Sequence, residues 1–176
     1  MKIAYNLIGA KKIINYVIFG LIFTLFSISS KAQENPPIPV RVEVNTAQFL
    51  NFGAFTTGIS GGTVTVTSDG IRNPPTGDIV LLSMGQPVSA ALFDVTANPG
   101  TIIQIQPQSS INLTGSNGGS ITLNIDSYST GQTFITTVSP PFANPVYVGG
   151  TLTVGNSSAS PPGQYTGTFT LTFIQQ

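Results

Sequence analysis

The sequence contains neither cysteine nor histidine, and only 7% of its 176 residues are charged. Without these two residue types the chain cannot build zinc sites from thiolate or imidazole ligands, nucleophilic sites of the cysteine or serine–histidine kind, or disulfides. Six Lys and Arg balance six Asp and Glu, so the basic surplus of a nucleic-acid-binding protein is missing as well. These absences favour a protein that is not an enzyme, carries no cofactor and does not bind nucleic acid.

The first 32 residues differ in composition from the rest of the chain. Lys2, Lys11 and Lys12 precede a long apolar run at residues 13–30. The stretch Ser30-Lys31-Ala32 at its end has a small residue at its first and last positions. A charged segment, an apolar segment and an A-x-A-like site predict a secretory signal peptide over residues 1–32, cleaved between Ala32 and Gln33. The alternative is an N-terminal membrane anchor, because the apolar run is close to the shortest length that spans a bilayer. The small-residue site and the prolines that follow favour cleavage. The predicted location is therefore secreted or at the cell surface, after transit through the periplasm.

Removal of this segment changes the charge of the protein. The remaining 144 residues keep only two basic side chains, Arg41 and Arg72, beside six acids, which gives a formal charge of −4. A chain of this length buries roughly two-thirds of its unfolded surface, enough for one core without disulfides. We therefore expect a single domain over residues 33–176, with a proline-rich leader at 33–37. No membrane span is expected after cleavage.

Short alternating segments fill the predicted domain, and no window of eleven or more residues shows a helical stripe. Two of them are regular: Ile38, Val40, Val42 and Val44 alternate with other residues, and so do the apolar positions of 165–173. Eight to ten short strands separated by Gly, Pro and Asn predict an all-β sandwich or barrel. The glycine-rich stretch 115–119 between two such segments predicts a hairpin. Gly149-Gly150 is either a two-residue hairpin turn or a bulge within one strand.

Five short stretches carry a resemblance to a known group of proteins: Leu50-Asn-Phe52-Gly53, Gly61-Gly62-Thr-Val-Thr-Val66, Phe93-Asp-Val-Thr96, Val148-Gly-Gly-Thr-Leu-Thr-Val154 and Gly163-Gln-Tyr165-Thr-Gly-Thr-Phe169. Together they resemble a bacterial secreted domain family of unknown function, itself similar to spore-coat-protein-U-type and fimbrial-subunit-like proteins. The resemblance spans residues 38–174 and rests on turn glycines and strand alternation. It implies an immunoglobulin-like (fimbrial-type) antiparallel β-sandwich and an exported structural or adhesive role.

Both ends of the predicted domain are candidate assembly strands. Fimbrial subunits complete their sandwich with a strand donated by a neighbour. The residues concerned here are Ile38, Val40, Val42 and Val44 at the N-terminal end, and Gly163, Tyr165, Phe169, Leu171 and Phe173 at the C-terminal end. The fimbrial pattern is incomplete, because the penultimate residue is Gln175 rather than an aromatic and no disulfide can form. The alternative is that both segments are ordinary strands of a self-complete sandwich.

Oxygen-bearing side chains gather in one predicted loop. Asp69, Asn73 and Asp78 are candidate ligands for Ca²⁺, which prefers oxygen. Their spacing matches no EF-hand or repeat calcium loop, so solvated turn residues are the alternative. The acids elsewhere stand singly, without the pair that a glycosidase needs, and we predict no catalytic residue.

Aromatic side chains near a proline-rich stretch suggest a second role. Tyr128, Phe134, Phe142 and Tyr147 lie in or near residues 139–145 and could stack on sugar rings, although packing in and around the core explains them too. The leading hypothesis is an exported structural protein, a fimbria- or coat-like subunit whose partners are further copies or other surface proteins. The alternative is a secreted, adhesin-like module that binds a glycan or a host partner.

Overall fold

The computed structural model describes residues 39–44, 48–85 and 87–176. The predicted signal peptide with its cleavage site, the leader at 33–37 and Ile38 lie outside these ranges. Twelve strands and no helix occur in the described ranges, so none of them holds a helix that could span a membrane. The prediction of an all-β fold is confirmed.

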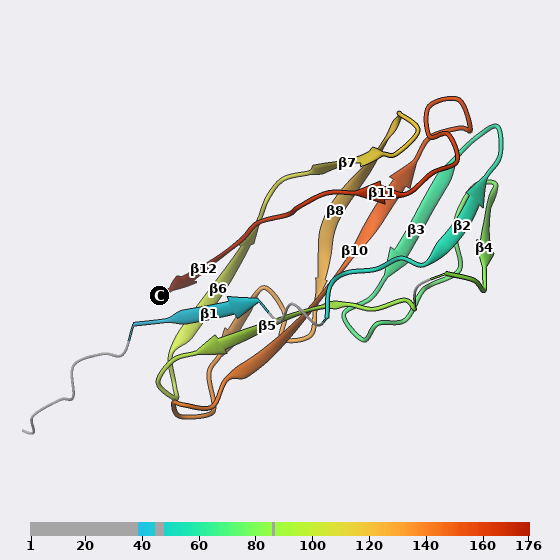
Figure 1. Cartoon of the computed structure of the whole chain (residues 1–176). Helices are drawn as coiled ribbons and strands as arrows, with labels where there is room; N and C mark the ends of the chain where they lie inside the picture. The colour runs from blue at the N-terminus through green and yellow to red at the C-terminus, as the bar shows by residue number, and fades with distance from the viewer. Residues whose placement is uncertain (1–38, 45–47, 86) are drawn as a thin grey trace, which may run out of the picture. The chain divides into compact units, whose positions relative to one another are not determined.

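The strands form three antiparallel sheets in a sandwich-like arrangement (Figure 1). They are β1 (Arg41–Val44), β2 (Ala54–Thr57), β3 (Gly62–Val66), β4 (Ile79–Leu82), β5 (Ala91–Thr96), β6 (Ile102–Pro107), β7 (Ile111–Gly115), β8 (Ser120–Tyr128), β9 (Thr133–Ile135), β10 (Asn144–Val154), β11 (Tyr165–Thr166) and β12 (Leu171–Gln175). The large sheet has the order β1-β5-β10-β8-β7-β11, and β3 also pairs with β10. The two smaller sheets are β12-β6-β9 and β2-β4.

The longest strand, β10, lies at the centre of the large sheet. It pairs with β8 on one side, and on the other with β5 along its first half and β3 along its second half. Its inward residues follow a period of two: Val146, Val148, Leu152 and Val154 are all buried. The same period buries Val64 and Val66 of β3, so alternation in the sequence accounts directly for the apolar inner face.

Gly149-Gly150 is not a hairpin turn, because β10 runs through it as one strand. The register with β8 shifts here, from Gly149↔Ser127 to Gly150↔Ile125, so the extra residue of the bulge is Asp126 on the partner strand. On the other side of β10 the chain leaves β3 and crosses over Gly149. A Cβ at this position would overlap the Val66 carbonyl oxygen and lie 2.6 Å from the Thr67 carbonyl carbon. Glycine is therefore required at position 149 because another backbone passes there.

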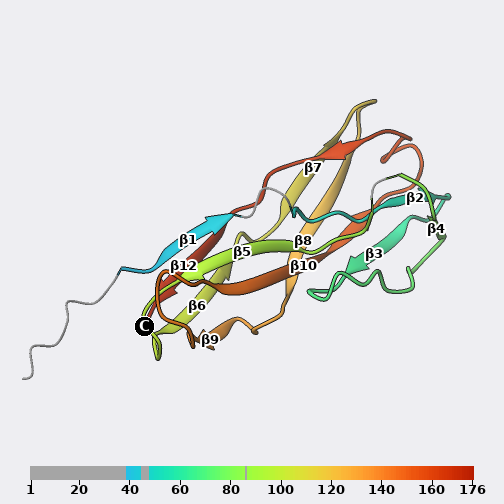
Figure 2. The ribbon, with the colours of Figure 1, turned by 60° about the horizontal axis from the view of Figure 1, so that its bottom comes forward.

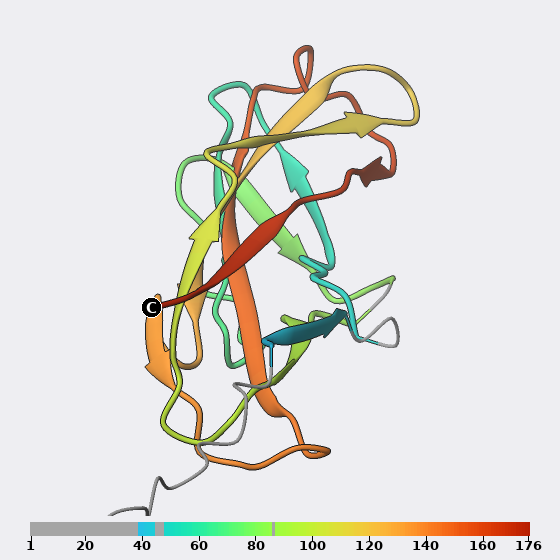
Figure 3. The ribbon, with the colours of Figure 1, turned by 90° about the vertical axis from the view of Figure 1, so that its left-hand side faces the viewer.

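The C-terminal alternating segment forms two strands rather than one. β11 pairs with β7 in the large sheet, whereas β12 pairs with β6 in the three-stranded sheet. The connection from β6 to β7 likewise passes between the three-stranded sheet and the large sheet (Figures 1 and 3). Where the two connections run side by side, the Gln108 amide donates to the Thr170 carbonyl oxygen (3.2 Å). Strands that change sheets at a corner in this way keep their alternation, so the sequence pattern does not reveal the change.

The hairpin predicted around residues 115–119 is confirmed as β7 and β8, which pair from Ile111↔Leu123 to Thr114↔Ser120. The strand count is higher than expected, partly because β9 was not predicted. This strand has three residues and pairs with β6 only. It is too short to show a period.

Candidate functional site

β1 is one of the two end strands of the large sheet, and β11 is the other. β1 pairs with β5 of the same chain, from Arg41↔Thr96 to Val44↔Phe93. Val42 is half-buried against the core, as is Val40 just before the strand. On the opposite face Arg41 and Glu43 are exposed and form an ion pair of 2.8 Å. In the structure β1 is therefore the first strand of its own sheet.

The C-terminal residues named as assembly candidates are divided between two sheets. Tyr165 lies in β11, where its hydroxyl donates to the Pro161 carbonyl oxygen (2.7 Å), and Gly163 lies in the loop before it. Phe169 is in the crossing segment. Leu171 and Phe173 are on the inward face of β12, yet both are only half-buried.

The half-burial has a geometric cause. The ring of Phe93, on β5, lies 6.1 Å from the ring of Phe169 and 5.8 Å from that of Phe173, centroid to centroid, so β12 faces β5 across the core (Figure 2). β12 is the last strand of its sheet, and β1 lies one strand beyond β5. β12 and β1 are thus end strands of their two sheets and lie close together at one rim of the sandwich (Figures 1 and 2).

We call this region the open edge and define it by the half-buried inward side chains that border it: Val40, Val42, Leu171 and Phe173. One side of β12 pairs with β6, and its other side meets no strand of the described chain. A further strand placed there would complete the hydrogen bonding of β12 and cover the four side chains.

The three calcium candidates lie along β3 rather than around one point. The loop after β3 returns antiparallel to it, because the Asn73 amide donates to Thr65 and the Asp78 amide to Gly61 (both 3.0 Å). Asp69 lies in the turn at the far end. One oxygen of Asp78 accepts from the Ser60 amide (2.8 Å), and the other is buried without a partner in the described chain. No group of three acidic side chains gathers in the ranges that the structure covers.

The four candidate aromatics also lie apart. Tyr128 and Phe134 pack against the core, and Phe142 is 72% exposed on a loop. Tyr147 lies on β10 between two buried valines, so its ring is on the outer face of the large sheet. Of the four, Tyr147 alone lines one of the hollows described below.

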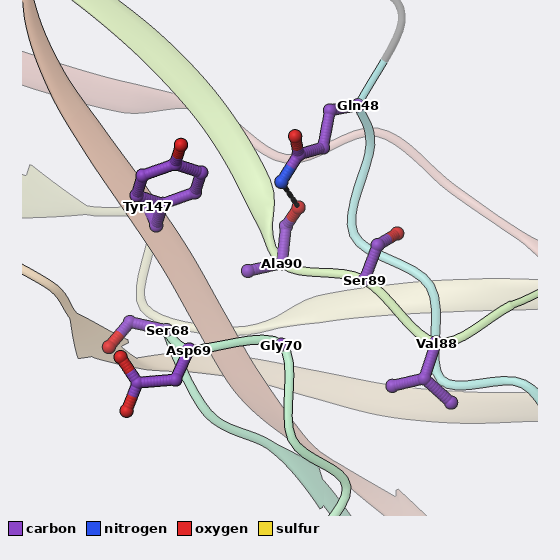
Figure 4. A pocket seen from close by; sticks show the side chains of 8 residues that line it. All are labelled: Gln48, Ser68, Asp69, Gly70, Val88, Ser89, Ala90 and Tyr147. Carbon is purple, nitrogen blue, oxygen red and sulfur yellow. Dashed lines mark hydrogen bonds between the residues drawn. The ribbon is translucent and has the colours of Figure 1, made fainter.

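A hollow of about 390 Å³ adjoins this outer face (Figure 4). Tyr147, Ser68 and Asp69 lie along one side of it, and Gln48 and Ser89 lie along the other. The sequence patterns did not indicate Gln48 or Ser89. Both reach the hollow through pairings between distant segments, and no local pattern reports such pairings.

Arg72 lines a second hollow, of about 310 Å³, together with the exposed Met84. Its guanidinium donates to the carbonyl oxygens of Phe52 and Ala54 (both 3.0 Å) and of Leu82 (3.2 Å). These bonds join the chain at β2 to the end of β4. Three of its five N–H donors thus hold these chain segments together.

Among the residues that the structure describes, Tyr128 has a clearly shifted pKa. Burial raises the pKa of Tyr128 above its usual value, and the nearby charge of Asp126 raises it further, while a hydrogen bond with Gln132 opposes both. The phenol donates to the Ile125 carbonyl oxygen (3.3 Å). The raised pKa follows from packing at the end of β8.

Comparison with known proteins gives one match. No curated protein and no solved structure matches the chain. Residues 42–174 match a family described as "Domain of unknown function (DUF4402)". The match begins within β1 and ends within β12, and so includes three of the four side chains of the open edge as well as the residues that line the hollow beside Tyr147. The chain belongs to this family.

Proposed function

We propose that the protein is an exported, non-enzymatic structural subunit of the cell surface, which assembles with further copies through strand pairing. The open edge is the observation that carries this proposal. Its four apolar side chains are half-buried, although residues in equivalent inward positions at the centre of the sandwich are almost fully buried. An added strand would remove this apolar surface from water and pair the free side of β12.

The donor in this proposal is the segment Ile38–Val44 of another copy. Within it, Val40 and Val42 place apolar side chains on one face, and β1 lies at the rim of its own sheet, held by β5 alone. Contact between β1 of one copy and β12 of the next joins two different surfaces. A head-to-tail contact of this kind, repeated without closing into a ring or a mutual dimer, produces filaments. Lysine, which commonly blocks edge pairing, is absent after residue 31.

The proposed location rests on the N-terminal sequence. Residues 1–32 have the three parts of a signal peptide, and cleavage after Ala32 would leave a chain of charge −4. A coat-like or fimbria-like role agrees with this export and with the resemblance to spore-coat and fimbrial subunits. N-terminal sequencing of the exported protein should give Gln33 as the first residue, and retention of Met1 would instead support the membrane anchor.

Assembly is tested with a pair of matched threonine variants. Thr172 is exposed on β12, at the open edge, and Thr153 is exposed on β10, at the centre of the large sheet. We expect the purified exported protein to form filaments in electron micrographs and concentration-dependent oligomers in size-exclusion chromatography. Thr172→Lys should shift assembly to concentrations about tenfold higher or more, because a lysine on an edge strand opposes strand addition. Thr153→Lys should assemble like the parent.

Two results would overturn this function. One is a strictly monomeric protein at high concentration. The other is equal assembly of the parent and Thr172→Lys, which would place the contact away from β12. Circular dichroism and thermal melting of both variants show whether a loss of assembly reflects a loss of folding.

A further inference from the structure

The hollow beside Tyr147 has walls that the fold holds rigidly. On one side the Tyr147 amide donates to the Ser129 hydroxyl (2.9 Å), and the Ser68 amide donates to the Ser127 hydroxyl (2.8 Å), which ties the turn carrying Asp69 to β8. Within that turn the Gly70 amide donates to the Thr67 carbonyl oxygen (2.9 Å). Preformed walls reduce the entropy lost when a ligand binds.

The opposite wall is held in the same way. The Gln48 side-chain amide donates to the Ala90 carbonyl oxygen (3.3 Å), and the Ser89 hydroxyl donates to the Phe49 carbonyl oxygen (2.6 Å). The backbone of Asn51 and Ser89 forms a mutual bridge. The volume of the hollow, about 390 Å³, lies within the range of small-molecule sites.

Several polar groups at the hollow are not used by the fold. Among the described residues, the Asp69 carboxylate, the Tyr147 hydroxyl and the Ser68 hydroxyl make no hydrogen bond, and Asp69 makes no ion pair. Gln48 keeps its carbonyl oxygen and its second N–H free, because it donates only once. The site thus offers acceptors, donors and one aromatic ring within a single concave surface.

We propose that this hollow binds one neutral hexose unit of a glycan. Sugar hydroxyls both donate and accept, so they can use the Asp69 carboxylate and the Gln48 amide together. The apolar C–H face of a hexose ring can pack on the ring of Tyr147, which leaves the hydroxyls at the rim of the hexose free to bond. This inference is independent of the assembly proposed above, because Tyr147 lies on the outer face of the large sheet rather than at the open edge.

The main competing ligand is an arginine or lysine side chain of a basic peptide. A cation could pair with Asp69 and stack on Tyr147. The side chain of such a residue itself has no acceptor for the free N–H of Gln48, however, so this N–H would be left to water or to the peptide backbone. Acidic sugars are disfavoured because the only charged group lining the hollow is the Asp69 carboxylate. The balance of donors and acceptors therefore favours a neutral sugar.

The test is a two-dimensional NMR titration of the isotope-labelled exported protein. The probes are the methyl glycosides of glucose, galactose and mannose, with methyl glucuronide and N-acetylarginine amide as comparators. We expect at least one neutral glycoside to shift the amide signals of Ser68, Gly70 and Tyr147. Tyr147→Ala and Asp69→Ala should each weaken this binding about tenfold or more. Phe142→Ala is the matched control, because this aromatic is exposed away from the hollow, and its affinity should equal that of the parent.

Three outcomes would overturn the proposal. The first is that none of the neutral glycosides shifts these amides at any soluble concentration. The second is a shift that Tyr147→Ala retains or Phe142→Ala loses. The third is a stronger response to N-acetylarginine amide than to every glycoside, which would identify the hollow as a site for basic peptides. The amide spectra of the variants also report whether each remains folded.

Discussion

The centre of the large sheet and its rim are built from the same kind of sequence but reach different degrees of burial. At the centre, β10 pairs along both sides, and its inward valines Val146 and Val148 are 0% exposed. At the rim, β1 and β12 each pair along one side, and Val42 and Leu171 stay half-buried. Alternation determines which face of a strand is apolar. The position of the strand, at the centre or at the rim of its sheet, determines how far that face is covered.

The centre and the rim therefore differ in how much apolar surface remains available for binding after the monomer has folded. Central positions use nearly all of their apolar area for folding, whereas rim positions use only part of theirs. Substitutions at the centre should therefore change the stability of the monomer, and substitutions at the rim should mainly change what the monomer binds. Three predictions test this difference, beginning with the largest effect.

Gly149→Ala should destabilise the protein by about 3 kcal/mol or more, because the added methyl group meets the backbone that leaves β3 and neither strand can move easily. Urea denaturation followed by circular dichroism measures this loss. Thr153→Ala, four residues further along β10 and exposed, should change stability by less than about 0.5 kcal/mol. If Gly149→Ala were equally mild, the crossing over β10 would not be tightly packed, and the centre would be less rigid than described.

Ile105→Ala and Leu171→Ala compare the two regions within one pair of strands. Ile105, on β6, is 2% exposed, and its loss should cost about 2–5 kcal/mol. Leu171, on the adjacent β12, is half-buried, and its loss should cost only about 1 kcal/mol in the monomer.

Both Ala variants are measured by urea unfolding of dilute, unassembled protein. Their difference is the informative quantity, because the same sheet holds both side chains. Equal losses would show that the open edge is already covered in the monomer. In assembled protein the cost of Leu171→Ala should increase, since the added strand buries its side chain.

The smallest effect concerns Tyr128, at the end of β8 between the centre and the rim. Because its pKa is raised in the folded protein, the folded state holds the phenolic proton more tightly than the unfolded state does. Its contribution to stability is intact below about pH 10 and is lost as the pH rises through the folded-state pKa. Unfolding free energies across this alkaline range should therefore decline slightly less steeply for Tyr128→Phe than for the parent. Identical slopes would show that burial of this ring has no electrostatic consequence.

Much of the fold was predictable from local patterns. The apolar alternation of Val40, Val42 and Val44 and the glycines between β7 and β8 correctly indicated a strand and a hairpin, because both depend on neighbours in the sequence. The division of residues 165–173 between two sheets was not predictable, since alternation is the same on either side of a corner. The position of the bulge residue Asp126, opposite Gly149-Gly150, was also not predictable, because it belongs to the partner strand β8.

The candidate sites depend even more on distant contacts. Tyr147 and Asp69 were each singled out in the sequence, for sugar stacking and for calcium respectively, but nothing local indicated that they line one hollow. Gln48 reaches the same hollow because its carbonyl oxygen accepts from the Leu92 amide (3.1 Å). Patterns in the sequence identified residue types with useful chemistry. Pairing between strands determined which of them work together.

The hydrogen bonds of Arg72 have a consequence for the resistance of the protein to trypsin-like proteases. After residue 32 the chain offers trypsin-like proteases two cleavage points, Arg41 and Arg72, and none from residue 73 onward. The guanidinium that such an enzyme must bind is, at Arg72, held by three carbonyl oxygens of the chain segments that carry β2 and β4. Cleavage there would first require these bonds to break. The exposed Arg41, near the start of the domain, is thus left as the accessible target, and a cut after it would leave β2 to β12 uncut.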